Sequence, residues 1–306
     1  MRILVVGAGA VGGYFGARLV QSGADVTFLV RASRAARLRS EGITLVSPEG
    51  ARTSVPVATT SADELRDPYD LILLAVKATS LDAALEDIMP AVGDETVVLP
   101  VLNGIGHIDK LEKRVGWQHV LGGVSIVATQ LDRDGAIHRL APGASITFGE
   151  LDGASSSRVD SIAELFAPAD FDSRASNTIV QDMWEKWLFM AAGGATTVLL
   201  GGTVGEINAV KGGTDSVRTI VAEVTSILDA AGHAARPEAS SRVLATLTAP
   251  GSPFTTSLYR DFVGGRPTEV ESILGDLIRV GTSNGISSPL LSAATVRLRV
   301  HQAKIA

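Results

Sequence analysis

Apolar runs of strand length alternate with helical patterns through the first half of the chain. The runs lie at residues 3–6, 26–30, 71–76, 96–101 and 120–127. Between the first two, residues 10–21 repeat apolar side chains such as Val11 and Phe15 at helical spacing. Strands that alternate with helices predict a parallel sheet covered on both faces, which is a doubly wound α/β domain.

Several smaller elements complete this half. Asp134-Gly135 favours a hairpin turn, because this dipeptide suits the backbone of two-residue turns. The other expected elements are a strand pair at 42–47 and 53–58 that extends the sheet, a short helix at 61–65, hairpin strands at 136–140 and 145–149, and a helix at 158–166.

The pattern changes near Asn177, after which helical periodicity dominates and no convincing strand follows. The helices are expected at 179–192, 217–231, 238–247, 257–263, 268–282 and 290–301. We therefore predict two domains, a Rossmann-type domain at residues 1–176 and an all-helical domain at residues 177–306.

Composition and charge exclude several classes of protein. The chain has 306 residues, 45% of them hydrophobic, a net charge of −6 and no cysteine. These values favour a sizeable core and disfavour nucleic acid as a partner, disulfides and cysteine–metal sites. Residues 187–205 are uncharged enough to suggest a membrane span, but glycines interrupt them, which favours a buried helix and turn. We expect a soluble, cytoplasmic protein that does not bind membranes.

A glycine-rich segment follows the first apolar run. Gly7-Ala8-Gly9-Ala10-Val11-Gly12 has G-x-G-x-x-G spacing between a predicted strand and a predicted helix. The first glycine suits a tight turn, the second admits a pyrophosphate close to the backbone, and the third allows close packing of helix and strand. A glycine-rich turn without a ligand is the alternative, but the strand–turn–helix context favours a dinucleotide site.

The end of the second strand distinguishes the two nicotinamide dinucleotides. NAD sites usually place an acidic residue there to bind the ribose 2′-hydroxyl. This chain instead has Arg31, followed by Arg34 and Arg37, which suits a 2′-phosphate. A solvated basic turn is the alternative. The arginines favour NADP(H) as the cofactor.

Three further residues follow predicted strands of the same sheet. Lys77, Asn103 and Ala128 lie just beyond apolar runs, and ligands of open α/β sheets bind at the carboxyl ends of strands. We expect all three near the cofactor. An ordinary Asn-Gly turn and a solvated loop lysine are the alternatives for Asn103 and Lys77. The five histidines are scattered without metal-ligand spacing, so no metal site is expected.

Motifs along nearly the whole chain resemble the ketopantoate reductase (2-dehydropantoate 2-reductase) family. They are the glycine segment Gly7–Gly12, Arg31, Val76-Lys77-Ala78, Asn103-Gly104-Ile105-Gly106, Trp184-Glu185-Lys186 and Pro267-Thr268-Glu269. The resemblance implies a Rossmann domain, a helical C-terminal domain like that of 6-phosphogluconate dehydrogenase, and a cleft between them. It also implies NADPH-dependent reduction of a 2-oxo acid to a 2-hydroxy acid, with 2-dehydropantoate of pantothenate biosynthesis as the leading substrate, and allows a homodimer.

The resemblance also assigns roles to residues. It places Lys77, Asn103, Ala128 and Glu269 near the cofactor, with Asn103 also at the substrate. Lys186 falls at the catalytic lysine, and Ser257 at a serine that binds the substrate carboxylate. A lysine ammonium can stabilise the charge that forms on a carbonyl oxygen and can donate the proton. From the residues alone, a lysine snorkelling at the end of a core helix is the alternative.

This chain departs from the family pattern in the expected substrate pocket. Members carry asparagines four and eight residues after the lysine, where this chain has Met190 and Gly194, and Val204 replaces a third. Losing polar groups changes which substrate a site holds. Reduction of another keto acid or ketone is therefore an alternative, and a non-catalytic NADP(H) sensor is a third hypothesis.

Overall fold

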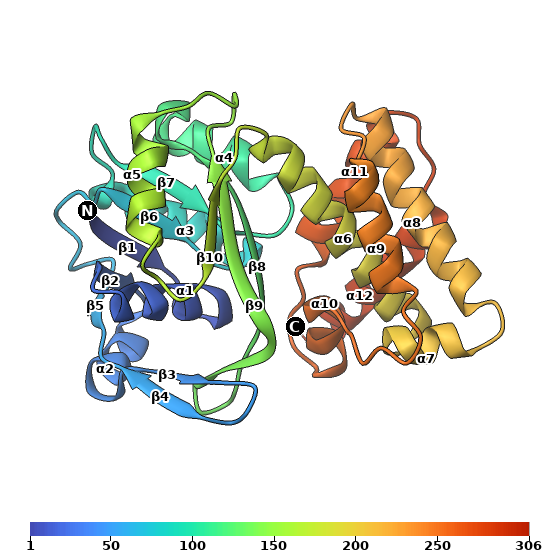
Figure 1. Ribbon diagram of the computed structural model, residues 1–306, viewed down its shortest axis with the longest axis horizontal. Helices are drawn as coiled ribbons and strands as arrows, with labels where there is room; N and C mark the ends of the chain where they lie inside the picture. The colour runs from blue at the N-terminus through green and yellow to red at the C-terminus, as the bar shows by residue number, and fades with distance from the viewer. Residues whose placement is uncertain (306) are drawn as a thin grey trace. The chain divides into compact units, whose positions relative to one another are not determined.

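The computed structural model describes residues 1–305 and divides the chain into two compact units. The first unit comprises Met1–Leu102 and His107–Val180. The second comprises Asn103–Gly106 and the residues from Gln181 onward. Figure 1 shows strands with helices in the first unit and helices alone in the second. The domain boundary between residues 176 and 177 stays a prediction.

A parallel five-stranded sheet forms the centre of the first unit, as the apolar runs predict. Its order is β5 (Ala58–Thr60), β2 (Asp25–Leu29), β1 (Arg2–Val6), β6 (Leu71–Leu74) and β7 (Val97–Pro100). Strands β1, β6 and β7 are almost wholly buried, which explains why their sequences are continuous apolar runs rather than alternating ones. The doubly wound α/β class is thereby confirmed.

A second sheet corrects part of the predicted topology. It consists of β3 (Ile43–Val46), β4 (Arg52–Val55), β8 (Gly122–Leu131), β9 (Ile137–Gly149) and β10 (Asp172–Ala175). The pair expected to extend the central sheet is the antiparallel hairpin β3–β4 of this second sheet. The strand expected at 120–127 also belongs here, and a single bridge from Val120 to Val98 joins it to the central sheet.

The predicted hairpin turn is present, but its flanking strands were assigned wrongly. β8 precedes the turn, and residues 136–140 and 145–149 fall within or beside one strand, β9, that follows it. Pro142 and Gly143 lie between these two segments, where the pairing of β9 with β8 is irregular. The helix expected at 61–65 is also wrong: this segment forms turns, with bonds from the amide of Glu64 to the carbonyl oxygen of Ser61 and from the amide of Ser61 to Oε2 of Glu64.

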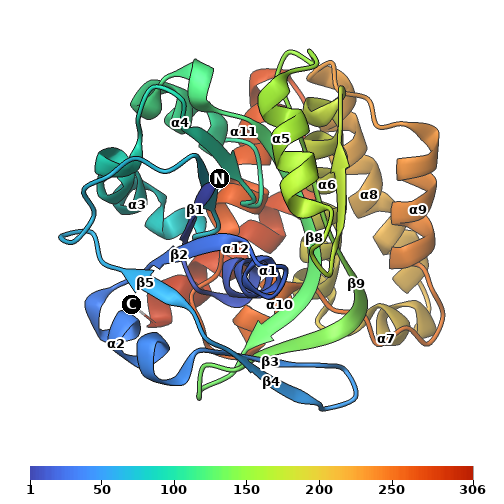
Figure 2. The ribbon, with the colours of Figure 1, turned by 60° about the vertical axis from the view of Figure 1, so that its left-hand side comes forward.

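Helix α1 (Ala10–Gln21) lies between the two sheets, as Figure 2 shows end-on. Phe15 of α1 shares one core with Phe28, Phe148 and Phe166, each fully buried. Full burial of each such side chain contributes about 1.5–3 kcal/mol. The remaining helices of the unit are α2 (Ala32–Glu41), η1 (Ala78–Ser80), α3 (Leu81–Ile88), η2 (Met89–Ala91), α4 (His107–Val115), η3 (Trp117–His119) and α5 (Ser157–Phe166).

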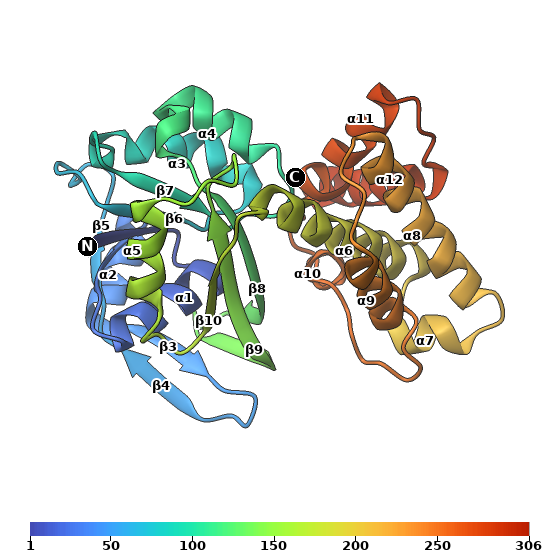
Figure 3. The ribbon, with the colours of Figure 1, turned by 45° about the horizontal axis from the view of Figure 1, so that its top comes forward.

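The second unit is helical, which confirms the change of pattern near Asn177. Its helices are α6 (Ile179–Leu200), α7 (Val204–Ala209), α8 (Gly213–Ala230), α9 (Pro237–Leu247), α10 (Ser257–Val263), the π-helix η4 (Glu271–Gly275), α11 (Asp276–Ser283) and α12 (Pro289–Ile305). Figure 3 shows this group of helices with α6 passing through it. The helix expected at 268–282 is therefore divided between η4 and α11.

Helix α6 is buried on all sides along residues 191–198, as expected of a helix that is apolar all round. The Nε1 of Trp187 donates to the carbonyl oxygen of Ile273 at 2.8 Å, and the hydroxyls of Thr197 and Thr256 hydrogen-bond at 2.9 Å. These bonds tie α6 to η4 and to the start of α10. Across residues 1–305, no helix is long and apolar enough to cross a membrane.

Candidate active site

The glycine segment forms a turn in which each glycine meets a different requirement. Gly7 has φ +96°, a conformation that side chains disfavour. A Cβ atom on Gly12 would lie 2.2 Å from the carbonyl oxygen of Gly7, so only glycine permits this approach of α1 to the turn. A Cβ on Gly9 would find no atom within 4 Å. The turn is therefore tightly packed beneath Gly12 and open in front of Gly9.

Helix α1 begins directly at this opening. Gly9 is its N-cap residue, so no side chain caps the helix, and its first turn carries no acidic residue. The amide groups of a first helical turn and the helix dipole favour a phosphate. The backbone of Ala8, Ala10 and Val11 therefore fits a dinucleotide pyrophosphate.

Arg31 lies where the second strand leads into α2. It is exposed and is the N-cap residue of α2. Arg37 binds Glu41 at 2.7 Å and the carbonyl oxygen of Asp134, while Arg34 donates to the carbonyl oxygen of Gly135 at 3.4 Å. Of the three arginines suggested by the sequence, Arg34 and Arg37 thus contact the β8–β9 turn, and Arg31 is exposed.

Lys77 and Ala128 also belong to the first unit. Lys77 is exposed and lies at the N-cap position of η1, three residues beyond β6. Ala128 lies at the irregularity in β8, where Val127 pairs with Ala144 but Thr129 pairs with Arg139. Such irregularities re-aim the backbone and are common near functional sites.

Asn103 lies three residues beyond β7, but the structure assigns it to the second unit. Its Nδ2 donates to Oε2 of Glu269 at 3.2 Å. Gly104 has φ +78°, and a Cβ there would lie 2.3 Å from the carbonyl oxygen of Ser272, so the segment packs closely against η4. Two motifs 166 residues apart are therefore joined.

Lys186 lies on α6 in the same unit and is partly buried. Burial lowers its pKa to about 8, while the Glu269 carboxylate acts in the opposite direction. An ammonium with a pKa near 8 is a good proton donor close to neutral pH. The charge of Glu269 thus acts on Lys186, and Glu269 accepts a hydrogen bond from Asn103; we call these three residues the lysine cluster.

The expected substrate residues lie on α6 and α10. Met190 is partly buried and Gly194 is buried. A Cβ on Gly194 would lie 2.9 Å from Cδ2 of Leu258, so Leu258 occupies the space beside it. Ser257 is exposed and is the first residue of α10, directly after the N-cap residue Thr256. Val204 is fully buried in the core.

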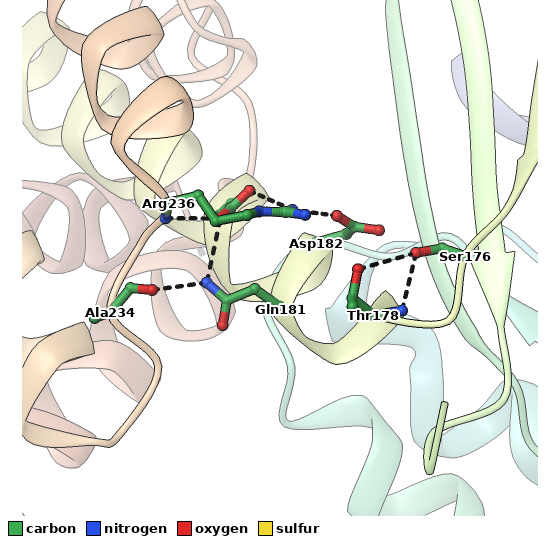
Figure 4. Close-up of polar contacts among 7 residues, drawn as sticks. Ser176, Thr178, Gln181, Asp182, Ala234 and Arg236 are labelled. Carbon is green, nitrogen blue, oxygen red and sulfur yellow. Dashed lines mark hydrogen bonds and ion pairs between the residues drawn. The ribbon is translucent and has the colours of Figure 1, made fainter. Parts of the chain in front are cut away.

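Sequence reasoning missed a charged cluster beside Lys186. Arg236, just before α9, pairs with both Asp182 and Glu185 of α6. Figure 4 shows the Arg236 guanidinium reaching toward Asp182, with Gln181 reaching Ala234. It also shows Ser176 and Thr178 of the first unit, where the amide of Thr178 donates to Oγ of Ser176 at 3.2 Å. Arg236 is 51 residues from Glu185, and no local pattern links them.

Residues 3–153 match the family Ketopantoate reductase PanE/ApbA, and residues 178–302 match Ketopantoate reductase PanE/ApbA C terminal. The chain is 33% identical to the uncharacterized oxidoreductase YkpB of Bacillus subtilis, across 99% of this chain and 100% of that protein. The structure of 2-dehydropantoate 2-reductase from Geobacter metallireducens is 28% identical, with a TM-score of 0.87, and the match covers 98% of this chain and 99% of that one.

A structure of D-mandelate dehydrogenase with NADH and anilino(oxo)acetate also has this fold. It superposes with a TM-score of 0.89 at 24% identity, across 100% of this chain and 99% of that one. At this level of identity the likeness concerns the fold. These proteins are oxidoreductases, and D-mandelate dehydrogenase was solved in two structures with NADH.

Proposed function

The chain belongs to the ketopantoate reductase family of oxidoreductases, and we propose that it reduces a 2-oxo acid to a 2-hydroxy acid with NADPH. The observation that carries this proposal is the lysine cluster. It places an ammonium of lowered pKa, about 8, in one group with a carboxylate and an amide. Such a group suits the carbonyl oxygen of a substrate that gains negative charge.

We assign the cofactor to residues that fit its parts. The open backbone at Gly9 and the first turn of α1 would hold the pyrophosphate, and Arg31 the 2′-phosphate. Lys77, Asn103, Ala128 and Glu269 are proposed near the cofactor from the family resemblance. The preference for NADPH over NADH rests on Arg31 alone.

The reaction converts a ketone, a hydride and a proton into an alcohol. NADPH supplies the hydride when it is bound. Lys186 stabilises the negative charge on the carbonyl oxygen and donates its proton to that oxygen. Glu269 keeps the ammonium form of Lys186 populated, because its charge opposes the effect of burial. Asn103, which donates to Glu269, holds that carboxylate in place, and Ser257 is proposed to bind the substrate carboxylate.

The first substrate candidate is 2-dehydropantoate, whose reduction gives pantoate for pantothenate biosynthesis. A second candidate is a 2-oxo acid with an apolar side chain. Leu258 fills the space beside Gly194, and Met190 lies one turn closer to Lys186 on the same face of α6. An apolar wall gives no hydrogen bond to a substrate hydroxyl, and missing hydrogen bonds discriminate strongly between substrates.

Steady-state assays with NADPH and NADH over a panel of 2-oxo acids test the proposal. The panel should include 2-dehydropantoate, the same carbon skeleton without its hydroxyl, and a 2-oxo acid with an aromatic side chain. NADPH oxidation with at least one member, lost in Lys186→Ala, is the expected result. No oxidation with any member would contradict 2-oxo acid reduction, and a higher kcat/KM for the hydroxyl-free acid would favour the second candidate.

A further inference from the structure

Arg236 holds two carboxylates on the turn of α6 that carries Lys186. Its main-chain amide donates to Oε1 of Glu185 at 2.9 Å. Its Nε contacts the same oxygen at 2.7 Å, and Nη2 contacts Oε2 at 2.6 Å. Nη2 also pairs with Asp182. The side chains of Asp182 and Glu185 are only 7% and 11% exposed. Because water solvates them poorly, each carboxylate needs a positively charged partner close by.

The spacing of residues on α6 gives Asp182 a second possible partner, Lys186. Asp182 lies four residues before Lys186, the spacing at which an acidic and a basic side chain face each other on a helix. An acid N-terminal to the lysine is the favourable orientation for such a pair. Without Arg236, the ammonium of Lys186 would be a ready partner for Asp182.

The connection that carries Arg236 is braced against α6 at further points. Nε2 of Gln181 donates to the carbonyl oxygen of Ala234 at 2.9 Å and to Glu185 at 3.2 Å (Figure 4). The rings of His233 and Trp184 stack with centroids 4.5 Å apart. The connection is therefore fixed against α6 by Ala234 and His233, and the guanidinium of Arg236 by the two carboxylates.

We propose that Arg236 is a positioning residue for Lys186. Because Arg236 pairs with Asp182 and Glu185, the Lys186 ammonium stays available to the substrate carbonyl oxygen. This inference rests on the proposed role of Lys186 as proton donor. It predicts that, without Arg236, the Asp182 carboxylate pairs with the Lys186 ammonium. An ammonium paired with Asp182 is a weaker acid and is turned away from the substrate.

The charged groups along this part of α6 come from several elements, and the one that acts on the pKa of Lys186 is Glu269. Asp182 and Glu185 lie on α6 itself, Arg236 and His233 on the α8–α9 connection, and Glu269 just before η4. Burial would raise the pKa of Glu185, but its bonds with Arg236 hold that pKa below its usual value. Burial also lowers the pKa of His233, which favours the neutral ring near neutral pH.

The test compares Arg236→Gln, Arg236→Lys, Asp182→Asn and the double variant Asp182→Asn/Arg236→Gln. Arg242→Gln is the matched control, because Arg242 is an exposed arginine of the adjoining helix α9. One readout is the pKa of Lys186, measured on the protein alone by competitive acetylation with acetic anhydride across pH and peptide mass spectrometry. The other is kcat and KM across pH with the best 2-oxo acid of the panel.

We expect Arg236→Gln to raise the Lys186 pKa by about one unit or more and to lower kcat at neutral pH about tenfold, with a smaller change in KM. The double variant should restore both values, since an asparagine side chain at position 182 carries no charge to attract Lys186. Arg236→Lys should retain part of kcat, and Asp182→Asn and Arg242→Gln should resemble the unaltered protein.

An unchanged Lys186 pKa in Arg236→Gln, or a double variant as impaired as the single one, would overturn the proposal. If Arg236→Gln does not fold, as judged by circular dichroism, the double variant and Arg236→Lys decide in the same way. The acetylation measurement needs no substrate. If the Lys186 pKa changes as expected but no 2-oxo acid is reduced, the result therefore counts against the proposed function and not against this role of Arg236.

Discussion

At the scale of single residues, Lys186 combines a proposed catalytic role with a cost to stability. Its pKa is lowered from 10.5 to about 8 in the folded protein. Below pH 8 both the folded and the unfolded chain bind the proton, so the full cost of burying the charge is present. Between pH 8 and 10.5 the unfolded chain binds more protons than the folded one, and stability rises with pH.

This difference predicts that Lys186→Met stabilises the protein at neutral pH while abolishing activity. Methionine fills a similar volume without a charge. We expect the free energy of unfolding at pH 7 to increase by about 1–3 kcal/mol, because each pKa unit corresponds to about 1.4 kcal/mol. Urea unfolding at pH 7 and pH 10.5 measures it. A gain that does not shrink toward pH 10.5 would refute this explanation.

Arg31 is the residue whose replacement should separate the two cofactors. Arg31→Ala is expected to weaken NADPH binding about 10–100-fold, because a charge-assisted hydrogen bond contributes about 1.5–3 kcal/mol. NADH lacks the 2′-phosphate, so its affinity should change little. Fluorescence titration with both dinucleotides measures this, with Arg37→Ala as the control, since Arg37 is engaged by Glu41. Equal losses for NADPH and NADH would remove Arg31 from the 2′-phosphate site.

At the scale of elements, the turn from β1 into α1 serves both packing and binding. A Cβ atom on Gly12 would strike the carbonyl oxygen of Gly7 and lie 2.8 Å from Cβ of Ala75, whereas one on Gly9 meets open space. The two glycines therefore allow the packing and binding functions of the turn to be tested separately.

Gly12→Ala is expected to destabilise the protein by about 1–3 kcal/mol, since α1 must move away from the turn. Gly9→Ala should leave the melting temperature nearly unchanged but weaken NADPH binding at least about tenfold, because the methyl group enters the space proposed for the pyrophosphate. Differential scanning fluorimetry with and without NADPH compares the two. If Gly9→Ala bound NADPH normally, the pyrophosphate would have to lie elsewhere.

The sequence predicted those elements whose cause is local. The apolar runs of β1 and β6 and the glycines at 7, 9 and 12 identify a strand, a turn and a helix from neighbouring residues alone. The second sheet was missed because β9 pairs not only with its neighbour β8 but also with β3 and β10, which other elements separate from it in the sequence. Sequence pattern does not determine which strands pair.

The lysine cluster shows the same limit within the site. Lys186 and Glu269 were identified from a resemblance, and Asn103 also from its place after a predicted strand. The bond between Asn103 and Glu269 depends on tertiary packing of Gly104 against η4. The Arg236 cluster had no signal, because an arginine before a proline is unremarkable until its partners on α6 are known.

At the scale of the whole molecule, the two units carry different parts of the proposed chemistry. The glycine turn and Arg31 belong to the first unit, and the lysine cluster belongs to the second. Hydrogen exchange should show this division. We expect NADPH alone to slow exchange most in residues 7–16, and a 2-oxo acid added with NADP⁺ to slow it further in the first half of α6. Protection by NADPH confined to α6 would contradict the assignment.

The measurement that tests the central claim most directly is the single-turnover rate of NADPH oxidation by a 2-oxo acid across pH, in the unaltered protein and in Lys186→Ala. We predict a rate constant that falls above a pKa near 8, as the Lys186 ammonium is lost. Lys186→Ala should be slower by about 10²–10⁴-fold and should not show this titration. A variant that keeps both the rate and its alkaline fall would show that another group supplies the proton.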